Sequence, residues 1–177
     1  MNYLGIDKAS ISNGPGVRVV LWVAGCSIHC KGCQNPESWD LNAGCMFDQS
    51  AKHNLFEAMS KPYVKGLTLS GGHPLEYNNL PDIYNLIKEC KLYFPQQDIW
   101  LYTGYTLATS DFDTSGDIGW DNSLLRNHII AMCDVVVDGP YIEEQRDITL
   151  KFRGSRNQRL IDVKETLKQG SIITIQN

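Results

Sequence analysis

The sequence has no excess of basic residues and no long apolar run, and both absences restrict what the protein can be. Its 16 Lys and Arg residues are outnumbered by 20 Asp and Glu residues, so the formal net charge is −4 at pH 7. Proteins that bind nucleic acids need clustered positive charge to contact phosphates, and the sequence has no such cluster. No apolar run approaches the roughly 20 residues that cross a membrane. We therefore expect neither a nucleic acid nor a membrane as partner.

The first residues, MNYLGIDKAS, also lack the apolar core of a secretory signal peptide. The chain nevertheless contains six cysteines. In a reducing compartment, thiols bind metals more often than they form disulfides. We therefore expect a cytoplasmic protein in which some of the cysteines are metal ligands.

The length of 177 residues and a hydrophobic content of 42% predict one globular domain that spans residues 1–177, without linker, repeat or low-complexity tract. Strands are expected at residues 17–23, 66–70, 99–103, 134–138 and 172–175. Amphipathic helices are expected at residues 49–60, 80–93 and 122–132. Apolar strands that alternate with helices predict an α/β fold whose sheet is mostly parallel.

The most informative motif is a CxxxCxxC group, Cys26, Cys30 and Cys33, directly after the first expected strand. Three thiolates on one loop can bind three irons of a cubane cluster. A closed cluster needs four cysteines, so the fourth iron would be left open to a small molecule. The motif therefore predicts a reactive iron–sulfur centre.

Two other interpretations of these cysteines remain open. Their spacing also fits one stripe of a helix packed in a core, although Gly25 and Gly32 disfavour a helix there. Thiolates also suit zinc, and Cys45 is a candidate for the fourth position of such a site. Cys90 and Cys133 are expected to be small buried hydrophobes, with Cys133 at the start of a strand.

Further motifs follow the next expected strands. Gly71-Gly72-His73-Pro74 comes after the second strand and Gly104-Tyr105 after the third. The carboxyl ends of parallel strands share one edge of the sheet, so these motifs should converge with the cysteines. A plain strand-to-helix turn would use the same glycines. Residues 152–158 form a donor-rich loop, in which we expect Arg153 and Asn157 to contact a ligand or partner, and we expect Arg159 to be solvated.

In this order, the motifs resemble the radical S-adenosylmethionine superfamily, which has CxxxCxxC after the first strand and Gly-Gly-X-Pro after the second. Residues 13–18 (NGPGVR), Gly25-Cys26 and residues 33–35 (CQN) are similar to the activating enzymes of glycyl-radical enzymes. Residues 70–75, 100–105, 137–139 and 153–158 are similar to activating proteins of the anaerobic (class III) ribonucleoside-triphosphate reductase. The likeness covers about residues 13–158. It assigns no role to the C-terminal tail that follows.

The resemblance implies a partial, open β/α barrel that holds one [4Fe-4S] cluster on Cys26, Cys30 and Cys33. S-adenosylmethionine would bind the fourth iron. Its reductive cleavage would give a 5′-deoxyadenosyl radical that takes a hydrogen atom from a glycine of the reductase. By family position, the cofactor contacts are Gly32, Gln34, Gly71, Gly72 and His73.

The implied partners are the large subunit of the reductase, as protein substrate, and a low-potential electron donor such as a flavodoxin. The implied assembly is a hetero-tetramer of two reductase and two activase chains. The alternatives are an activase of another glycyl-radical enzyme and a non-catalytic, cysteine-liganded zinc module.

Two residues depart from the family pattern. His73 stands where relatives usually carry an acid, and Gln34 where they often carry an aromatic residue. A neutral imidazole still accepts one hydrogen bond, and we expect backbone carbonyls of the Gly71–His73 turn to accept from the amino group of the cofactor.

Overall fold

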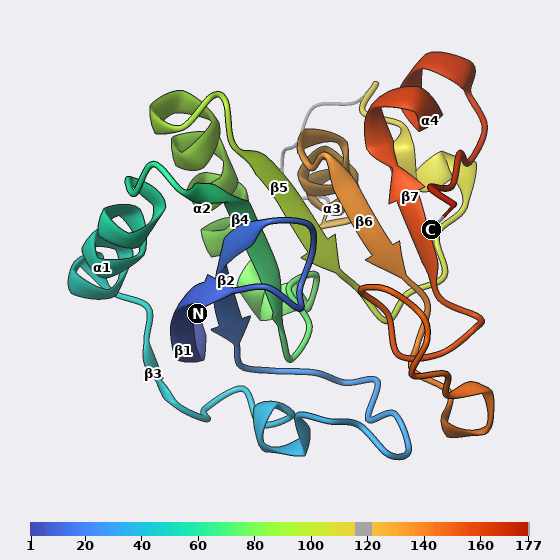
Figure 1. Cartoon of the computed structure of the whole chain (residues 1–177), viewed down its shortest axis with the longest axis horizontal. Coiled ribbons are helices and arrows are strands. Elements are labelled where there is room, and N and C mark those ends of the chain that lie inside the picture. Colours follow the sequence, from blue (N-terminus) through green and yellow to red (C-terminus); the bar gives the residue numbers. More distant parts are fainter. Residues whose placement is uncertain (116–121, 177) are drawn as a thin grey trace.

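The structure, a computed structural model, describes residues 1–115 and 122–176 and consists of one sheet with helices packed against it (Figure 1). The strands are β1 (Asn2–Ser10), β2 (Val17–Val23), β3 (Cys45–Met46), β4 (Val64–Gly71), β5 (Asp98–Tyr102), β6 (Val135–Asp138) and β7 (Arg159–Asp162). The α-helices of the described ranges are α1 (Gln49–Met59), α2 (Leu80–Tyr93), α3 (Asn122–Met132) and α4 (Val163–Gln169).

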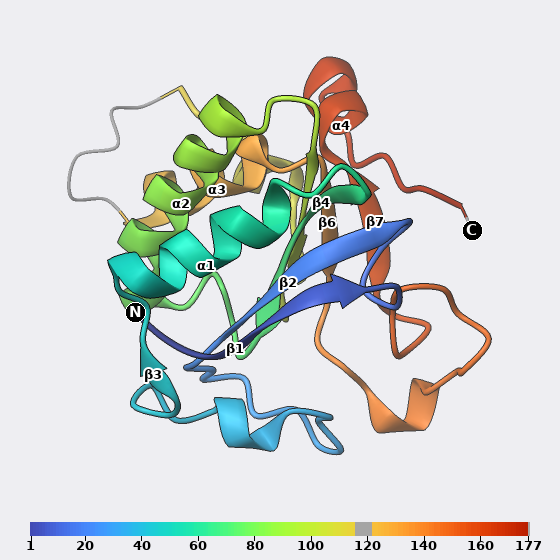
Figure 2. The ribbon, with the colours of Figure 1, turned by 60° about the vertical axis from the view of Figure 1, so that its left-hand side comes forward.

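The sheet has the strand order β3-β1-β2-β4-β5-β6-β7. Its centre, β2-β4-β5-β6, is parallel and follows the order of the chain, whereas β1, β3 and β7 run antiparallel to their neighbours. Crossovers between parallel strands are right-handed, so successive connections in one direction place their helices on the same side. Figure 2 shows α1, α2 and α3 together on one face of the sheet. The expected α/β fold with a mostly parallel sheet is confirmed.

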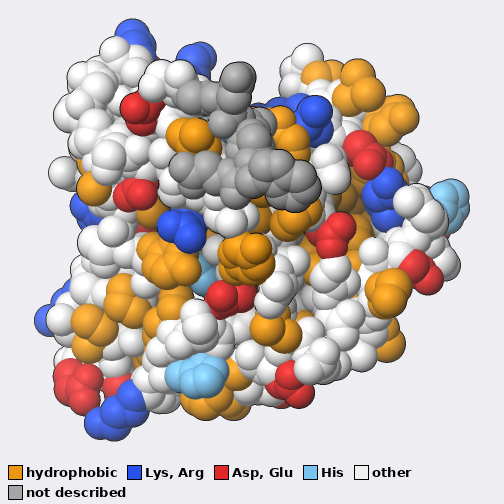
Figure 3. All heavy atoms as spheres, turned by 180° about the vertical axis from the view of Figure 1, so that it is seen from behind, with side chains coloured by type: hydrophobic (Ala, Val, Ile, Leu, Met, Phe, Trp, Pro, Cys, Tyr) orange, Lys and Arg blue, Asp and Glu red, His pale blue; other side chains and the backbone are white. Residues whose placement is uncertain are grey.

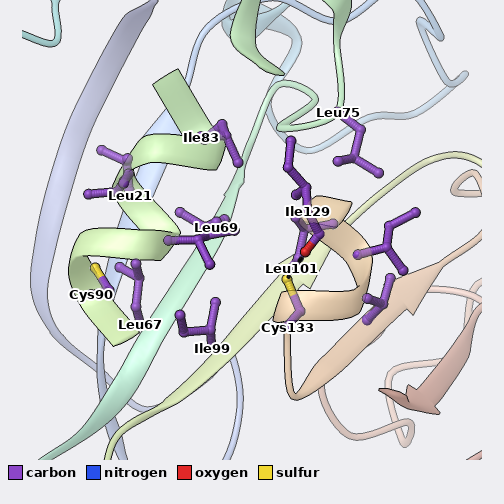
Figure 4. Packing of buried hydrophobic residues seen from close by; sticks show 14 of the residues in the cluster. Leu21, Leu67, Leu69, Leu75, Ile83, Cys90, Ile99, Leu101, Ile129 and Cys133 are labelled. Atoms are coloured by element: carbon purple, nitrogen blue, oxygen red, sulfur yellow. Dashed lines mark hydrogen bonds between the residues drawn. The ribbon is translucent and has the colours of Figure 1, made fainter. Parts of the chain in front are cut away.

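Side chains alternate between the two faces along each central strand, as the pleat requires. The helix-facing set is aliphatic and forms the main core (Figure 4), to which these strands contribute Val19, Leu21, Val23, Leu67, Leu69, Ile99, Leu101 and Val136. The intervening positions carry larger or polar side chains, among them Arg18, Trp22, Thr68, Ser70, Trp100 and Tyr102. One face therefore stabilises the fold, while the other offers aromatic and hydrogen-bonding groups.

Capping residues fix the ends of two helices. Asp48 precedes α1, and its carboxylate accepts a hydrogen bond from the backbone N–H of Ala51 at 2.9 Å. Asp162 does the same for α4 through the N–H of Glu165, also at 2.9 Å. Helix α4 then ends at Gly170, whose φ of 63° lies in the left-handed region that glycine adopts without strain.

The expected helices at 80–93 and 122–132 are confirmed with the same bounds, and α1 ends one residue before the expected limit. The strand expected at residues 172–175 is wrong, because this segment makes only an isolated bridge between Thr174 and Ile161. Cys133 precedes β6 and does not begin it. Cys90 and Cys133 are buried as expected, with 1% and 4% of their surface exposed (Figure 4).

Charge is mixed over the surface. The face seen in Figure 3, on the opposite side from the view of Figure 1, intersperses Lys and Arg with Asp, Glu and apolar side chains. Among residues 1–115 and 122–176, no helix is long and apolar enough to cross a membrane.

Candidate functional site

The three cysteines of the CxxxCxxC motif lie on an irregular loop that follows β2. Cys26, Cys30 and Cys33 are all half-buried and free of disulfides. The loop turns through left-handed backbone conformations at Gly25, His29 and Gly32, with φ of 92°, 49° and 73°. The alternative of a helical cysteine stripe is therefore wrong.

Backbone hydrogen bonds fasten the start of this loop to two neighbouring segments. The N–H of Gly25 donates to the carbonyl of Ser38 at 2.8 Å, and the carbonyl of Gly25 accepts from the N–H of His73 at 2.7 Å. One residue after Cys26, the N–H of Ser27 donates to Glu76 Oε2 at 2.9 Å. The cysteine loop and the turn after β4 are thereby held as one unit.

A cavity of about 220 Å³ lies between these segments at the carboxyl ends of the parallel strands. It is lined by Cys26, Cys30, Cys33, Gln34, Gly71, Gly72 and His73, together with Asn13, Trp22, Ile28, Asn35, Ser38, Trp39, Ser70, Tyr102, Thr103, Gly104, Gly139, Tyr141, Gly154 and Gln158. The motifs after β2, β4 and β5 therefore converge, as their positions in the sequence indicated.

Gly32 is placed differently from the other expected site residues. It lines a separate hollow, with Cys33, Tyr141 and Glu143. A side chain at Gly32 would collide with the carboxylate of Glu143. The stronger requirement for glycine here is the left-handed backbone, with a φ of 73°.

His73 is almost fully buried in the cavity wall. Its Nε2 lies 2.8 Å from Thr103 Oγ1, and its ring meets the ring of Tyr105 edge-on, with centroids 4.4 Å apart. Burial lowers the pKa of His73 to about 4, against the opposing effect of Glu76 and with a smaller lowering by Arg126. The imidazole is therefore neutral at pH 7. Its Nδ1 has no hydrogen-bond partner within the described residues.

The backbone of the same turn contains both used and unused acceptors. The carbonyl of His73 already accepts from the N–H of Glu76 at 2.9 Å and from Asn79 Nδ2 at 3.1 Å. No donor in residues 1–115 and 122–176 reaches the carbonyl of Gly72. Of these two carbonyls, that of Gly72 is the one left free to accept from a ligand.

A single metal ion and a cubane cluster need different arrangements of the three thiols. A tetrahedral zinc binds each sulfur at about 2.3 Å, so its ligands must converge on one point, whereas cysteines of a cubane bind separate irons. Within the described ranges, no three His, Cys, Asp or Glu side chains converge in that way. Cys45, the candidate fourth ligand, is exposed on β3 and lies outside the cavity lining. Burial raises the pKa of the Cys26 thiol, which a bound metal would reverse.

Several residues of the cavity wall carried no individual signal in the sequence. Trp39 stacks on His29, with ring centroids 4.5 Å apart and 24° between the planes. Thr103 holds His73, and Tyr141 enters from the loop after β6. The motifs at 137–139 and 153–158 indicated where this loop begins and ends, but not that Tyr141 lines the site.

The donor-rich loop places Arg153 and Asn157 outside the cavity lining, and their expected contact with a ligand or partner stays a prediction. Asn157 donates from Nδ2 to the carbonyl of Pro140 at 2.7 Å, so it holds the loop together. The expectation that Arg159 is solvated is wrong. Its guanidinium is partly buried and forms an ion pair with Asp138, whose side chain is fully buried.

Comparison with known proteins adds independent information. The family model described as "4Fe-4S single cluster domain" matches residues 12–161. An anaerobic ribonucleoside-triphosphate reductase-activating protein from Vibrio cholerae is 38% identical over 160 residues, which is 89% of this chain and 96% of the relative. Proteins of the same name from Enterobacteria phage T4 and Escherichia coli K12 are 38% and 33% identical over 160 residues, and cover 90% and 89% of this chain and 93% and 96% of their own.

Proposed function

This chain belongs to the family of anaerobic ribonucleoside-triphosphate reductase-activating proteins, and from that premise we propose that it activates this reductase by generating a glycyl radical on it. The observation that carries the proposal is the cavity in which the three thiols of the CxxxCxxC loop face the Gly71–His73 turn. A cluster held by three cysteines needs a further ligand, and the turn provides acceptors beside it.

We infer that Cys26, Cys30 and Cys33 hold a [4Fe-4S] cluster and that S-adenosylmethionine binds beside it. When bound and supplied with one electron by an external donor, these groups would supply the cleavage of S-adenosylmethionine to methionine and an adenosyl radical able to take a hydrogen atom from a glycine. The free carbonyl of Gly72 and the unpartnered Nδ1 of His73 support this assignment, because each can pair with a polar group of a ligand.

The chain's own residues hold the cysteine loop in position and enclose the cavity. The bond from Ser27 to Glu76 keeps the cysteine loop beside the turn. Trp39 and Tyr141 contribute aromatic surface to the cavity wall, which displaces water from the reacting groups. Gln34 lines the cavity beside Cys33, so its amide can bind the cofactor. The neutral His73 accepts or donates at Nδ1 without bringing charge into the cavity.

We further propose that the sheet is the arc of an open β/α barrel of radical S-adenosylmethionine type, and that residues 1–177 form one domain. The chain-ordered parallel strands with helices on one face support the first point. A low-potential donor such as a flavodoxin, a hetero-tetramer with two reductase chains, and a cytoplasmic location complete the proposal.

Anaerobic reconstitution with iron and sulfide tests the proposed function. The protein should bind four irons, cleave S-adenosylmethionine after reduction and, with the reductase, give a glycyl-radical signal in electron paramagnetic resonance. Cys26→Ser, Cys30→Ser and Cys33→Ser should each abolish all three results, whereas Cys45→Ser should retain them. A colourless protein that binds one zinc, or loss of the cluster in Cys45→Ser, would contradict the proposal.

A further inference from the structure

The loop between β6 and β7 lines the cavity near both of its ends and presents an apolar side chain to solvent between them. Ile148, near the tip of this loop, is 86% exposed, which is the largest exposed fraction among the large hydrophobic residues of the described ranges. Both ends of the loop line the cavity, through Tyr141 on one side and Gln158 on the other. Figure 2 shows this loop, in orange, along the same edge of the molecule as the cysteine loop, in blue just before the light-blue helical turn.

Hydrogen bonds hold the turn that carries Ile148. The carboxylate of Asp147 accepts from the N–H and the hydroxyl of Thr149, at 3.0 and 2.6 Å, and from Arg156 Nε at 3.0 Å. These bonds, those of Thr149 first, lower the pKa of Asp147 to about 2, so the carboxylate is ionised at neutral pH. The N–H of Asp147 also donates to the carbonyl of Gly154 at 3.2 Å. Ile148 is therefore presented by a preformed turn.

The part of the loop that follows the tip is held against the sheet by Phe152. Phe152 adopts a φ of 61°, which bulky residues rarely do and which persists only where the surroundings enforce it. Its ring packs edge-on against Trp100 with centroids 5.5 Å apart, and its carbonyl accepts from the hydroxyl of Tyr102 at 2.7 Å. Trp100 and Tyr102 belong to β5, so this contact lies on a strand that also contributes to the cavity.

The loop also differs in charge from the rest of the chain. Residues 139–158 contain four cationic side chains and three carboxylates, in a protein whose net charge is −4. Two of the carboxylates have cationic partners, since Glu144 pairs with Lys31 of the cysteine loop at 3.1 Å and Asp147 pairs with Arg156. Arg146 and Lys151, on either side of the tip, are exposed. The surface around Ile148 therefore favours an acidic partner.

We propose that Ile148, flanked by Arg146 and Lys151, is the docking anchor for the protein substrate, and that it enters an apolar pocket rimmed by carboxylates on the reductase. The inference rests on the proposed function. A preformed apolar anchor loses little conformational entropy on binding, and such anchors supply most of the affinity of an interface. Docking here would bring the glycine-bearing segment of the reductase over the cavity.

A larger apolar groove lies elsewhere on the molecule and provides the matched control. It has a volume of about 1040 Å³ and lies among α2, α3 and α4, with Leu92, Met132 and Leu167 in its lining. Figure 1 places the ends of these helices at the opposite edge of the sheet from the cysteine loop. A partner bound there would not cover the cavity. Leu92, 72% exposed, is the counterpart of Ile148 on this groove.

The experiment compares Ile148→Asp with Leu92→Asp in the reconstituted protein, without oxygen. Calorimetric titration with the reductase measures affinity, cleavage of S-adenosylmethionine by the reduced protein alone measures the basal reaction, and the glycyl-radical signal measures activation. Ile148→Asp should weaken reductase binding by about tenfold or more and leave basal cleavage unchanged. Leu92→Asp should match the parent in all three measurements.

Two further variants separate the anchor from its support. Asp147→Ala keeps Ile148 but removes the bonds that hold the turn, so it should also weaken binding. Lys151→Glu should slow association, most strongly at low salt. Parental affinity in Ile148→Asp, or loss of affinity in Leu92→Asp instead, would overturn the docking site alone. A parent protein that neither binds the reductase nor produces a radical on it would overturn the proposed function as well.

Discussion

His73 is a buried base in the wall of the cavity, and its surroundings disfavour its charged form. Burial has the largest effect, Arg126 adds a repulsion, and Glu76, whose Oε2 lies 3.9 Å from His73 Nδ1, opposes both. Thr103 and the ring of Tyr105 also contact the imidazole. An unfolded chain exposes this imidazole to water, so its pKa returns to the ordinary value near 6.5.

This difference in pKa predicts a loss of stability in mild acid. The unfolded state takes up the proton below pH 6.5, whereas folded His73 resists it until about pH 4, so the free energy of unfolding falls as the pH drops through this window. Between pH 7 and pH 4.5, the loss assigned to His73 is about 2 kcal/mol. Urea unfolding of the metal-free protein at both pH values measures this loss in the free energy of unfolding. The loss should be smaller by that amount in His73→Gln than in the parent protein. Equal losses in the two proteins would contradict the neutral imidazole.

Gly72 lies where the turn after β4 touches the cysteine loop. A Cβ atom at this position would lie 2.5 Å from the carbonyl oxygen of Gly25 and 2.8 Å from that of Ser38. Both atoms belong to backbone that supports the cysteine loop, so they cannot move without moving the loop.

Gly72→Ala should therefore damage the cluster site itself, and not only the approach of a ligand. We expect lower iron content after anaerobic reconstitution and a lower melting temperature. Gly5→Ala is the matched control, since a Cβ at Gly5 meets nothing within 4 Å. Normal iron content in Gly72→Ala would show that the contact to Gly25 is not needed to hold the cysteine loop.

Among the elements, β7 has a role that the sequence did not reveal. Strand β7 pairs antiparallel with β6 and places Arg159 against Asp138, at the end of β6. The hydrogen bonds to Asp138 raise the pKa of Arg159. Asp138 also accepts from the N–H of Leu107 at 2.9 Å, so one buried carboxylate joins β6, β7 and the loop after β5.

Arg159→Ala should be strongly destabilising, because it leaves the carboxylate of Asp138 buried without its cation. The expected loss in the free energy of unfolding is about 3 kcal/mol. Arg156→Ala, which removes the exposed partner of Asp147, should change this free energy little. Denaturant titration of both variants makes the comparison, and similar small losses would mean that Asp138 finds other partners when Arg159 is removed.

Other elements show which features of the fold the sequence could predict. Helix α2 was predicted with correct bounds because Leu80, Ile83 and Leu86 repeat at helical spacing and Pro81 stands at an early position. Strand β1 was not predicted, because its sequence contains Gly5 and polar residues and no continuous apolar run. It pairs antiparallel with β2. The apolar residues 172–175 read as a strand, but they pack against the core with only one bridge.

For the site, the cysteines and the Gly71–His73 turn could be predicted because each follows an apolar strand. Tyr141 and Trp39 could not, because their place in the cavity depends on how two loops pack and no local pattern records it.

At the scale of the whole molecule, the two sides of the sheet at which its strands begin and end have different properties. At one end, four successive parallel strands finish, and the loops that follow all four line the cavity that holds the thiols. The large groove at the other end is apolar and lined by helices. Parallel sheets hold their chemistry at the carboxyl ends of the strands, and the structure follows that rule.

Because the cavity opens at an edge and its cysteines are half-buried, the whole molecule should be sensitive to oxygen. A cluster bound by three cysteines has one iron that oxidants can reach, since no thiolate occupies it. The reconstituted protein should lose iron and colour in air. S-adenosylmethionine should slow this loss by binding the open iron, and the reductase should slow it further if it covers the cavity. Iron release followed by absorbance, with each addition made separately and with Ile148→Asp as control for the reductase, distinguishes the two effects. A protein that keeps four irons for hours in air would contradict the open-iron site.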